Sequence, residues 1–193
     1  GKYDVVLTLP QGYLSADAED GEIRRTVELA QGDVVDFGTV TMCQSASISG
    51  AVRIDDDGDG VIAEGAQPVS DLRVVLLRVK NGHTESIAET RTDENGRYRF
   101  DALYAGEYSV LFELDGEWTF TQYGQDSAVY GALTQSGSTQ AISLQIGDEV
   151  KNIDAGVTIP AQLTVNVFKD TQADGVKGVY EEAFEGIGVT LIH

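Results

Sequence analysis

The sequence is poor in cysteine and in basic residues, and each shortage excludes a class of protein. Cys43 is the one cysteine among 193 residues, so no internal disulfide can form. Lysine and arginine together number 13 against 32 aspartates and glutamates, which gives a net charge of −19. Nucleic acids and anionic membrane surfaces are bound through clustered basic residues. The composition therefore argues against a nucleic-acid partner and favours binding of cations.

Long apolar runs and catalytic motifs are also missing. No run of about 20 apolar residues is present, so we expect no membrane insertion, and no signal peptide is recognisable. The first residues read as the middle of a strand, so we expect the chain to be an excised fragment. The two histidines, His83 and His193, lie near no serine or cysteine in a recognisable nucleophile motif. We therefore expect no enzymatic activity.

What the sequence does contain is a pattern of short strands. Runs rich in Val, Ile, Leu, Tyr and Phe are separated by Gly, Asp and Asn, which predicts an almost entirely β structure. Residues 108–114 alternate as a half-buried strand does, and residues 74–77 are apolar on both faces, which is typical of a central strand. The expected strands are 4–9, 48–54, 72–79, 85–92, 97–100, 107–114, 140–146, 153–158, 163–168 and 188–192.

The segments between the strands give further expectations. Asp93-Glu94-Asn95-Gly96 is a strong turn signal and predicts a hairpin between residues 85–92 and 97–100. Residues 115–139, rich in Gly, Ser, Gln and Tyr, predict a long loop with short strand pieces. Residues 61–70 and 176–186 have room for a short turn of helix.

The most informative motif is the acidic loop from Asp55 to Val61. Asp55, Asp57 and Asp59 alternate, and Gly60 follows as the sixth residue. Alternate Asp side chains in a tight loop can converge on one hard cation, and Ca²⁺ takes six to eight oxygen ligands. Glycine permits the sharp turn, and the main-chain carbonyl of Val61 adds a further oxygen. The simpler alternative is a solvated acidic turn.

The acidic loop recurs within an internal repeat. Residues 163–193 align without a gap to residues 48–78, so that Asp170, Asp174 and Gly175 fall on Asp55, Asp59 and Gly60. At the other end, residues 1–5 align to residues 106–110. The chain is therefore expected to hold the C-terminal half of one repeat (1–45), a complete repeat (46–160) and the N-terminal half of a third (161–193).

The order of the motifs carries a family resemblance. A strand, D-x-D-x-D-G, an acidic stretch, a Val/Leu-rich strand, T-D-x-N-G-x-Y-x-F and a G-x-Y-x-V strand follow one another, here from Ile48 to Val110. This order resembles the SdrD B-like repeats of staphylococcal serine-aspartate-repeat adhesins, within the wider Cna B-like and prealbumin-like group. The resemblance implies an all-β fold of Greek-key, Ig-like or prealbumin-like β-sandwich repeats in tandem.

The resemblance also implies calcium in EF-hand-like loops and names the ligands. In the central repeat the ligands are Asp55, Asp57, Asp59 and the carbonyl of Val61. In the last repeat Glu181 stands at position twelve, where a bidentate Glu completes an EF-hand-type shell. The other ligands expected in that repeat are Asp170, Gln172, Asp174 and the carbonyl of Val176.

The central loop departs from this pattern at one position. Ala66 occupies position twelve and has no side-chain oxygen. Glu64 and Gln67 are near enough in sequence to substitute, and Asp71 is a third alternative from the start of the next strand. We therefore expect a calcium site with an altered ligand shell and moderate affinity.

The function implied is a calcium-stabilised stalk of a bacterial cell-surface or secreted adhesin. The expected partners are calcium ions and neighbouring repeats, with pairing of the half repeats between molecules. The alternative is a carbohydrate- or protein-binding module, as an adhesin or an accessory domain of a secreted enzyme. Its candidate aromatic platform is Trp118, Phe120, Tyr123 and Tyr130, although packing over the edge of the sandwich is the simpler reading of these side chains.

Overall fold

The computed structural model describes residues 1–121, 123–130, 135–159, 161 and 164–188. Throughout these ranges the chain forms strands, turns and loops, with no helical residue. The chain divides into two compact units, Gly1–Pro160 and Ala161–His193. The predicted all-β class is confirmed.

The first sheet of the central part is built around its longest strand, which is also the strand that leads into the acidic loop. β5 pairs antiparallel with β8 on one side and parallel with β13 and β14 on the other, and β10 adds to β14. The strands of this sheet are β5 (Ala46–Ile54), β8 (Arg97–Leu103), β10 (Thr119–Phe120), β13 (Glu149–Val150) and β14 (Ala155–Thr158).

The second sheet is entirely antiparallel. β6 lies between β7 and β9. Residues 74–77, which were expected to form a central strand, therefore do so. The outer edge of β9 pairs with two short strands, β11 and β12. The strands are β6 (Arg73–Lys80), β7 (His83–Arg91), β9 (Gly106–Glu113), β11 (Ser136–Ser138) and β12 (Ile142–Leu144).

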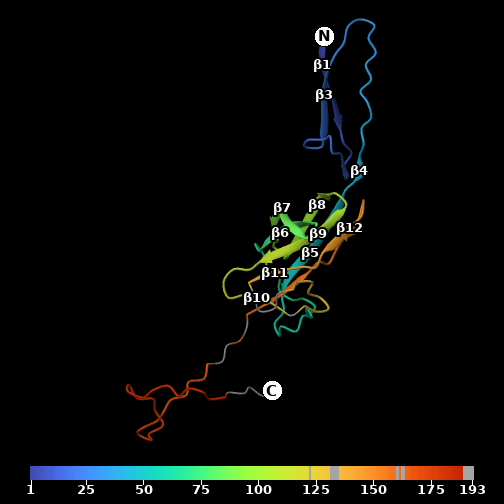
Figure 1. Ribbon diagram of the computed structural model, residues 1–193. Coiled ribbons are helices and arrows are strands. Elements are labelled where there is room, and N and C mark those ends of the chain that lie inside the picture. The colour runs from blue at the N-terminus through green and yellow to red at the C-terminus, as the bar shows by residue number, and fades with distance from the viewer. Residues whose placement is uncertain (122, 131–134, 160, 162–163, 189–193) are drawn as a thin grey trace. The chain divides into compact units, whose positions relative to one another are not determined.

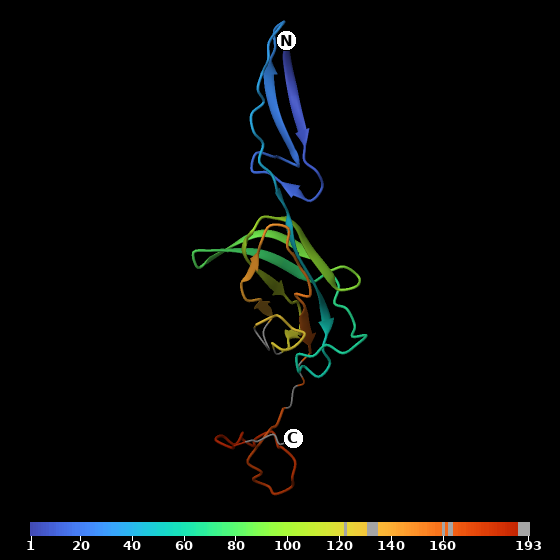
Figure 2. The same ribbon diagram turned by 90° about the vertical axis from the view of Figure 1, so that its right-hand side faces the viewer.

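The hydrophobic core lies between the two sheets (Figures 1 and 2). Alternate residues of each strand point inward, so Val110 and Phe112 of β9 are fully buried. Three aromatic rings meet edge to face, with centroids 5.5 Å apart between Tyr98 and Phe112 and 6.3 Å apart between Phe112 and Phe120. Such pairs add to the burial of apolar area, and the β-sandwich architecture is confirmed.

The turn at Asp93 forms as expected, but it does not make a hairpin within one sheet. The N–H of Gly96 donates to the Asp93 carbonyl at 2.9 Å, and the Asp93 N–H donates to the Arg97 carbonyl at 2.9 Å. The strand before the turn, β7, pairs with β6, whereas the strand after it, β8, pairs with β5 of the other sheet. The predicted hairpin pairing is wrong, because the local turn signal does not specify which sheet each strand joins.

Residues before the sandwich form a second, smaller set of strands. β1 (Lys2–Thr8) pairs antiparallel with β3 (Glu22–Glu28). β2 (Tyr13–Leu14) pairs with β4 (Cys43–Gln44), which leads directly into β5. The pairing repeats that of the sandwich, since Tyr3 faces Val27 as Tyr108 faces Ile142.

Residues 161 and 164–188 of the second unit contain one isolated β-bridge, between Phe168 and Ala183, and no longer strand. The strand expected over 163–168 is not formed in its described residues, and the one over 188–192 falls almost wholly outside them. The short helical turns expected over 61–70 and 176–186 are absent.

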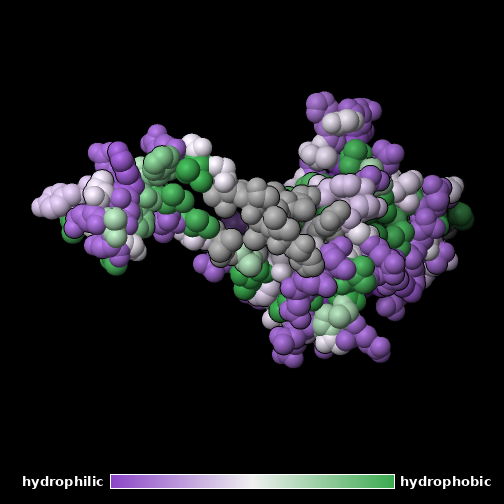
Figure 3. Space-filling model, turned by 90° about the horizontal axis from the view of Figure 1, so that it is seen from below, coloured by the Kyte–Doolittle hydropathy of each residue, from purple (hydrophilic) through white to green (hydrophobic). Residues whose placement is uncertain are grey.

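On the face in Figure 3, hydrophilic residues cover most of the described surface, with hydrophobic residues interspersed.

Candidate cation site

The acidic loop begins where β5 leaves the sheet, and Asp55 anchors it. The Asp55 N–H donates to the Val157 carbonyl of β14 at 2.8 Å, so the loop starts from a fixed point. The Asp55 carboxylate is 2% exposed and turns back into the loop. One oxygen accepts the N–H of Gly58 at 3.0 Å and the other that of Gly60 at 2.9 Å. The chain therefore wraps around this carboxylate, and Gly60 supplies the positive φ of 85° that the turn requires.

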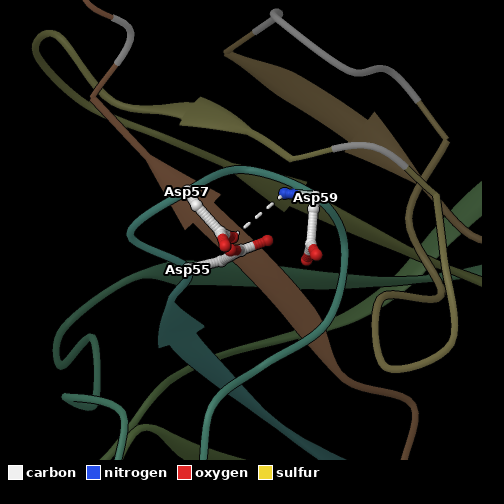
Figure 4. A group of neighbouring side chains, drawn as sticks. All are labelled: Asp55, Asp57 and Asp59. Carbon is white, nitrogen blue, oxygen red and sulfur yellow. Dashed lines mark hydrogen bonds between the residues drawn. The ribbon is translucent and has the colours of Figure 1, made fainter.

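Asp57 and Asp59 complete a cluster of three carboxylates. Asp57 Oδ1 accepts the N–H of Asp59 at 3.4 Å, and Asp59 Oδ1 accepts the N–H of Val61 at 2.7 Å. One oxygen from each of the three aspartates lies within 4.8 Å of the others, and Figure 4 shows the three side chains gathered inside the loop. An all-oxygen donor set of this charge suits a hard cation such as Ca²⁺ better than a softer metal.

The structure does not bring Glu64 or Asp71, two of the proposed substitutes for Ala66, into this cluster. Asp71 is 82% exposed and pairs with Arg91 at 3.3 Å. Glu64 lines a separate hollow of about 470 Å³ together with Arg53, Asp126 and Asp154. The Gln67 carbonyl is taken by the N–H of Ile54 at 2.9 Å. The three aspartates therefore stand together without the carboxylates of Glu64 and Asp71.

A residue that the sequence reasoning missed, Asp126, holds the far side of the loop. Its Oδ2 accepts the N–H of Ile62 at 3.1 Å, and its own N–H donates to the Gly60 carbonyl at 3.2 Å. Gly124 approaches the same carbonyl so closely that an added Cβ would lie 2.8 Å from it. Asp126 comes from the irregular segment, far from the motif in sequence, and no spacing rule points to it.

Beside the loop lies a buried hydroxyl with no partner. Thr121 is 2% exposed, and its Oγ1 is the one buried side-chain N or O atom without a hydrogen bond in the described part of the chain. It borders Gly156, where a Cβ would come within 2.4 Å of this oxygen and within 3.5 Å of Asp55 Oδ2. A buried hydroxyl is normally satisfied by water or another polar atom, so Thr121 Oγ1 still has hydrogen-bonding capacity next to Asp55.

The loop of the second unit repeats the backbone pattern of the first. The Asp170 carboxylate accepts N–H groups of Gln172 at 3.1 Å, Asp174 at 3.3 Å and Gly175 at 2.9 Å. These donors, with that of Gly175 foremost, lower the pKa of Asp170. Asp174 Oδ1 in turn accepts the N–H of Val176 at 2.9 Å. The first and sixth positions are therefore joined in the same way in both loops.

Glu181 closes the second loop from position twelve. Its carboxylate is buried and accepts the N–H of Gly178 at 2.8 Å and that of Thr171 at 2.7 Å. The Gly178 N–H is the main cause of a lowered pKa at Glu181, opposed by burial and by the negative charge of Asp170. Among the described residues, however, Asp55, Asp57 and Asp59 are the only group of three or more acidic, His or Cys side chains gathered within 4.8 Å. The second loop holds its acids further apart.

The aromatic residues of the candidate sugar platform do not share one exposed face. Phe120 is fully buried in the core, and Trp118 packs partly buried against it. Tyr123 and Tyr130 are exposed but stack on one another, with ring centroids 4.2 Å apart and an interplanar angle of 19°.

The described residues include no helix that is long and apolar enough to cross a membrane.

Comparisons with known proteins identify a matching family and several relatives. The model of the SdrD B-like domain family matches residues 46–157. Serine-aspartate repeat-containing protein F of Staphylococcus epidermidis is 28% identical over 99% of this chain, and protein D of Staphylococcus aureus is 26% identical over 99%. The chain spans only 12% and 15% of these two relatives.

A solved structure was also found, the minor pilin GBS52 of Streptococcus agalactiae. It is 14% identical, with 78% of this chain and 69% of that chain covered and a TM-score of 0.36. The family match by contrast covers more than half of the chain, including both sheets of the sandwich and the whole acidic loop. The chain therefore belongs to the SdrD B-like domain family.

Proposed function

We propose that this chain is a non-enzymatic, calcium-binding stalk segment of an adhesin-type protein on the bacterial cell surface. The observation that carries the proposal is the convergence of Asp55, Asp57 and Asp59 at the end of β5. Membership of a family whose relatives are serine-aspartate repeat-containing staphylococcal proteins supports the cell-surface location. The proposed location is the cell wall or the extracellular medium, where calcium is plentiful.

The residues proposed to hold Ca²⁺ in the central loop are the three aspartates, with the Val61 carbonyl and water as further oxygens. Ca²⁺ accepts water among its six to eight ligands, so the absence of an acid at Ala66 does not prevent binding. The ion neutralises charge that otherwise repels itself in a chain of net charge −19. In the last repeat the proposed ligands are Asp170, Gln172, Asp174, Val176 and Glu181.

The proposed role of the ion is mechanical. The loop joins β5 of one sheet to β6 of the other, so fixing it fixes the crossing between the sheets. The chain entering β5 is also held, because β4 pairs with β2 and the Ser45 N–H donates to the Gly12 carbonyl at 2.8 Å. A short paired connection resists bending better than a free linker, which supports a stiff stalk made with neighbouring repeats.

Pairing of half repeats between molecules remains a second part of the proposal. The side chains of Tyr3 and Leu7, which share one face of β1, are exposed. A two-stranded sheet is marginal by itself, and a further sheet would cover this face. Size-exclusion chromatography with light scattering tests the pairing, and a monomer at high concentration with β1 and β3 protected from hydrogen exchange contradicts it.

The experiment for the calcium proposal is thermal unfolding in about 1 mM Ca²⁺ and in EDTA. An ion that binds only the folded state stabilises it by RT ln(1 + [L]/Kd), about 2.7 kcal/mol at a hundredfold excess over Kd. We expect a higher Tm in calcium than in EDTA, and a smaller difference when Mg²⁺ replaces Ca²⁺. An equal Tm in all three conditions rules the proposal out.

A further inference from the structure

The outer face of the first sheet carries an unusual concentration of basic residues. A hollow of about 640 Å³ over β5 and β8 is lined by Arg53, Arg91, Arg97, Arg99 and Lys151. These are five of the 13 lysines and arginines of the chain, and only two acids, Asp93 and Asp154, share the lining. The ratio of acid to base is thus reversed here relative to the chain as a whole.

The shape of the hollow follows from the residues that face each other across the sheet. On β5 the outward residues Ser49 and Ala51 lie opposite Arg99 and Arg97 of β8, and Arg53 is the next outward residue. Small side chains on the central strand and long ones on the edge strand leave a trough between them. Lys151, which follows β13 on the other side of β5, stands on the opposite wall.

The two acids of the lining are engaged with the backbone. Asp93 Oδ1 accepts the N–H groups of Asn95 and Arg97, both at 2.8 Å. Asp154 Oδ1 accepts the N–H of Ala51 at 2.7 Å and is half-buried. Their charge still offsets part of the basic charge, but these two oxygens are already committed to main-chain donors.

The basic side chains still have N–H groups that can donate hydrogen bonds to a ligand. The Arg97 side chain makes no hydrogen bond or ion pair with any described residue, and the Arg53 side chain donates one bond, to the Ala66 carbonyl at 3.2 Å. Three others pair with acids on the rim: Arg91 with Asp71, Arg99 with Asp101 and Lys151 with Glu149. The side chains in these pairs are 45–82% exposed, and exposed ion pairs contribute little to stability. A ligand carboxylate can therefore replace a rim acid at small cost.

We propose that this hollow binds a short, extended, acidic segment of a partner polypeptide. Guanidinium groups match carboxylates in a planar, two-bond geometry. Arg97 and Arg99 lie two residues apart on one strand, a spacing of about 6.6 Å, and the same spacing separates alternate acids of an extended peptide. The proposal does not depend on the cation site, because none of Asp55, Asp57 and Asp59 lines the hollow.

The test is a titration of the whole chain with a peptide of alternating Glu and Thr, followed by backbone NMR shifts and calorimetry. The same peptide with Gln in place of Glu is the neutral control. We expect the Glu peptide to bind in both calcium and EDTA. The largest changes in backbone chemical shift should fall at Ser49, Ala51 and Arg97. Raising the salt from about 20 to about 500 mM should weaken it strongly, because exposed charges are screened.

A matched pair of double variants locates the site. R97Q/R99Q removes two charges from the hollow, and R78Q/K80Q removes two from exposed positions of β6. We expect the first to weaken peptide binding about tenfold or more and the second to change it little, with circular dichroism showing both folded. Equal weakening by both pairs, no binding at low salt, or binding of a sulfated polysaccharide without the peptide would each overturn the proposal.

Discussion

Asp55 accepts the N–H of Gly60 at 2.9 Å, and Asp170 accepts the N–H of Gly175 at the same distance. In each loop the first position therefore holds the sixth, so the carboxylate at position one shapes the loop in addition to any role as a ligand. The second loop shows that this bond does not depend on gathering the remaining acids. Loop geometry and cation binding are thus separable by mutation.

The first prediction separates these two roles of the central loop. Asp55→Ala leaves the buried N–H of Gly60 unpaired, which costs about 1–3 kcal/mol in unfolding free energy even in EDTA. In calcium the loss should be larger, because a proposed ligand is removed as well. Asp57→Ala removes an exposed carboxylate whose single bond, to the Asp59 N–H, is long at 3.4 Å. It should lower stability in calcium and leave stability in EDTA nearly unchanged.

Urea denaturation of both variants in calcium and in EDTA makes the comparison. Asp56→Ala is the matched control, because Asp56 is exposed and lies outside the cluster. If Asp57→Ala loses the same stability with and without calcium, Asp57 is not a calcium ligand.

The second prediction concerns the turn that carries the chain from one sheet to the other. Asp93 Oδ1 accepts the N–H groups of Asn95 and Arg97, so Asp93→Ala removes both bonds at once. We expect a loss of about 1–2 kcal/mol in chemical denaturation, comparable to the loss of a helix cap. Glu94→Ala, in the same turn but without such bonds, is the control and should cost under about 0.5 kcal/mol.

The same Asp93 variant tests whether the turn also binds a cation. A turn held only by its own hydrogen bonds loses the same stability in calcium and in EDTA. A loss that appears only in calcium would instead assign a cation to Asp93.

The sequence indicated the fold class and the central acidic cluster because both depend on local pattern. Alternation made Tyr108, Val110 and Phe112 inward-facing, and the D-x-D-x-D-G spacing brought three carboxylates together. Repetition pointed to equivalent strands in different parts of the chain, and β1 and β9 are such a pair.

What the sequence did not reveal depends on pairing between distant segments. The turn at Asp93 forms locally, but the sheets that β7 and β8 join are decided by packing of the whole sandwich. Asp126 reaches the loop only because residues 123–130 fold back over Gly60. Glu64 and Asp71 are near Asp59 in sequence, yet the chain carries them to other surroundings.

The third prediction tests the close contact that holds the β13–β14 connection against β5. A Cβ on Gly50 would lie 2.0 Å from the Ile153 carbonyl oxygen, and a main-chain atom cannot move aside cheaply. Gly50→Ala should therefore destabilise the fold by about 1–3 kcal/mol or more, as overpacking does. Gly106→Ala is the control, since its nearest neighbour would be 3.5 Å away and its φ is not positive. Equal thermal stability of the two variants would show that this contact is not tight in solution.

The fourth prediction concerns Asp154, whose pKa is raised mainly by burial, against the lowering effects of the Ala51 N–H and of Arg53. The folded state then binds the proton more tightly than the unfolded state, whose pKa is near 3.8. Stability contributed by this group is therefore greatest below pH 3.8 and is lost as the pH rises through the raised folded value. At neutral pH the ionised carboxylate is a net destabilising group.

Asp154→Asn removes that ionisation, and its side-chain oxygen can still accept the Ala51 N–H. We expect the variant to gain stability at pH 7 and to gain little at pH 3.5, measured by urea denaturation at both pH values. Asp148→Asn is the matched control, because the Asp148 carboxylate accepts the Gln145 N–H of its own turn and its carbonyl accepts the N–H of Ser47, near the start of β5. A loss of stability at pH 7 in Asp154→Asn would mean that attraction to Arg53 outweighs the cost of burying the charge.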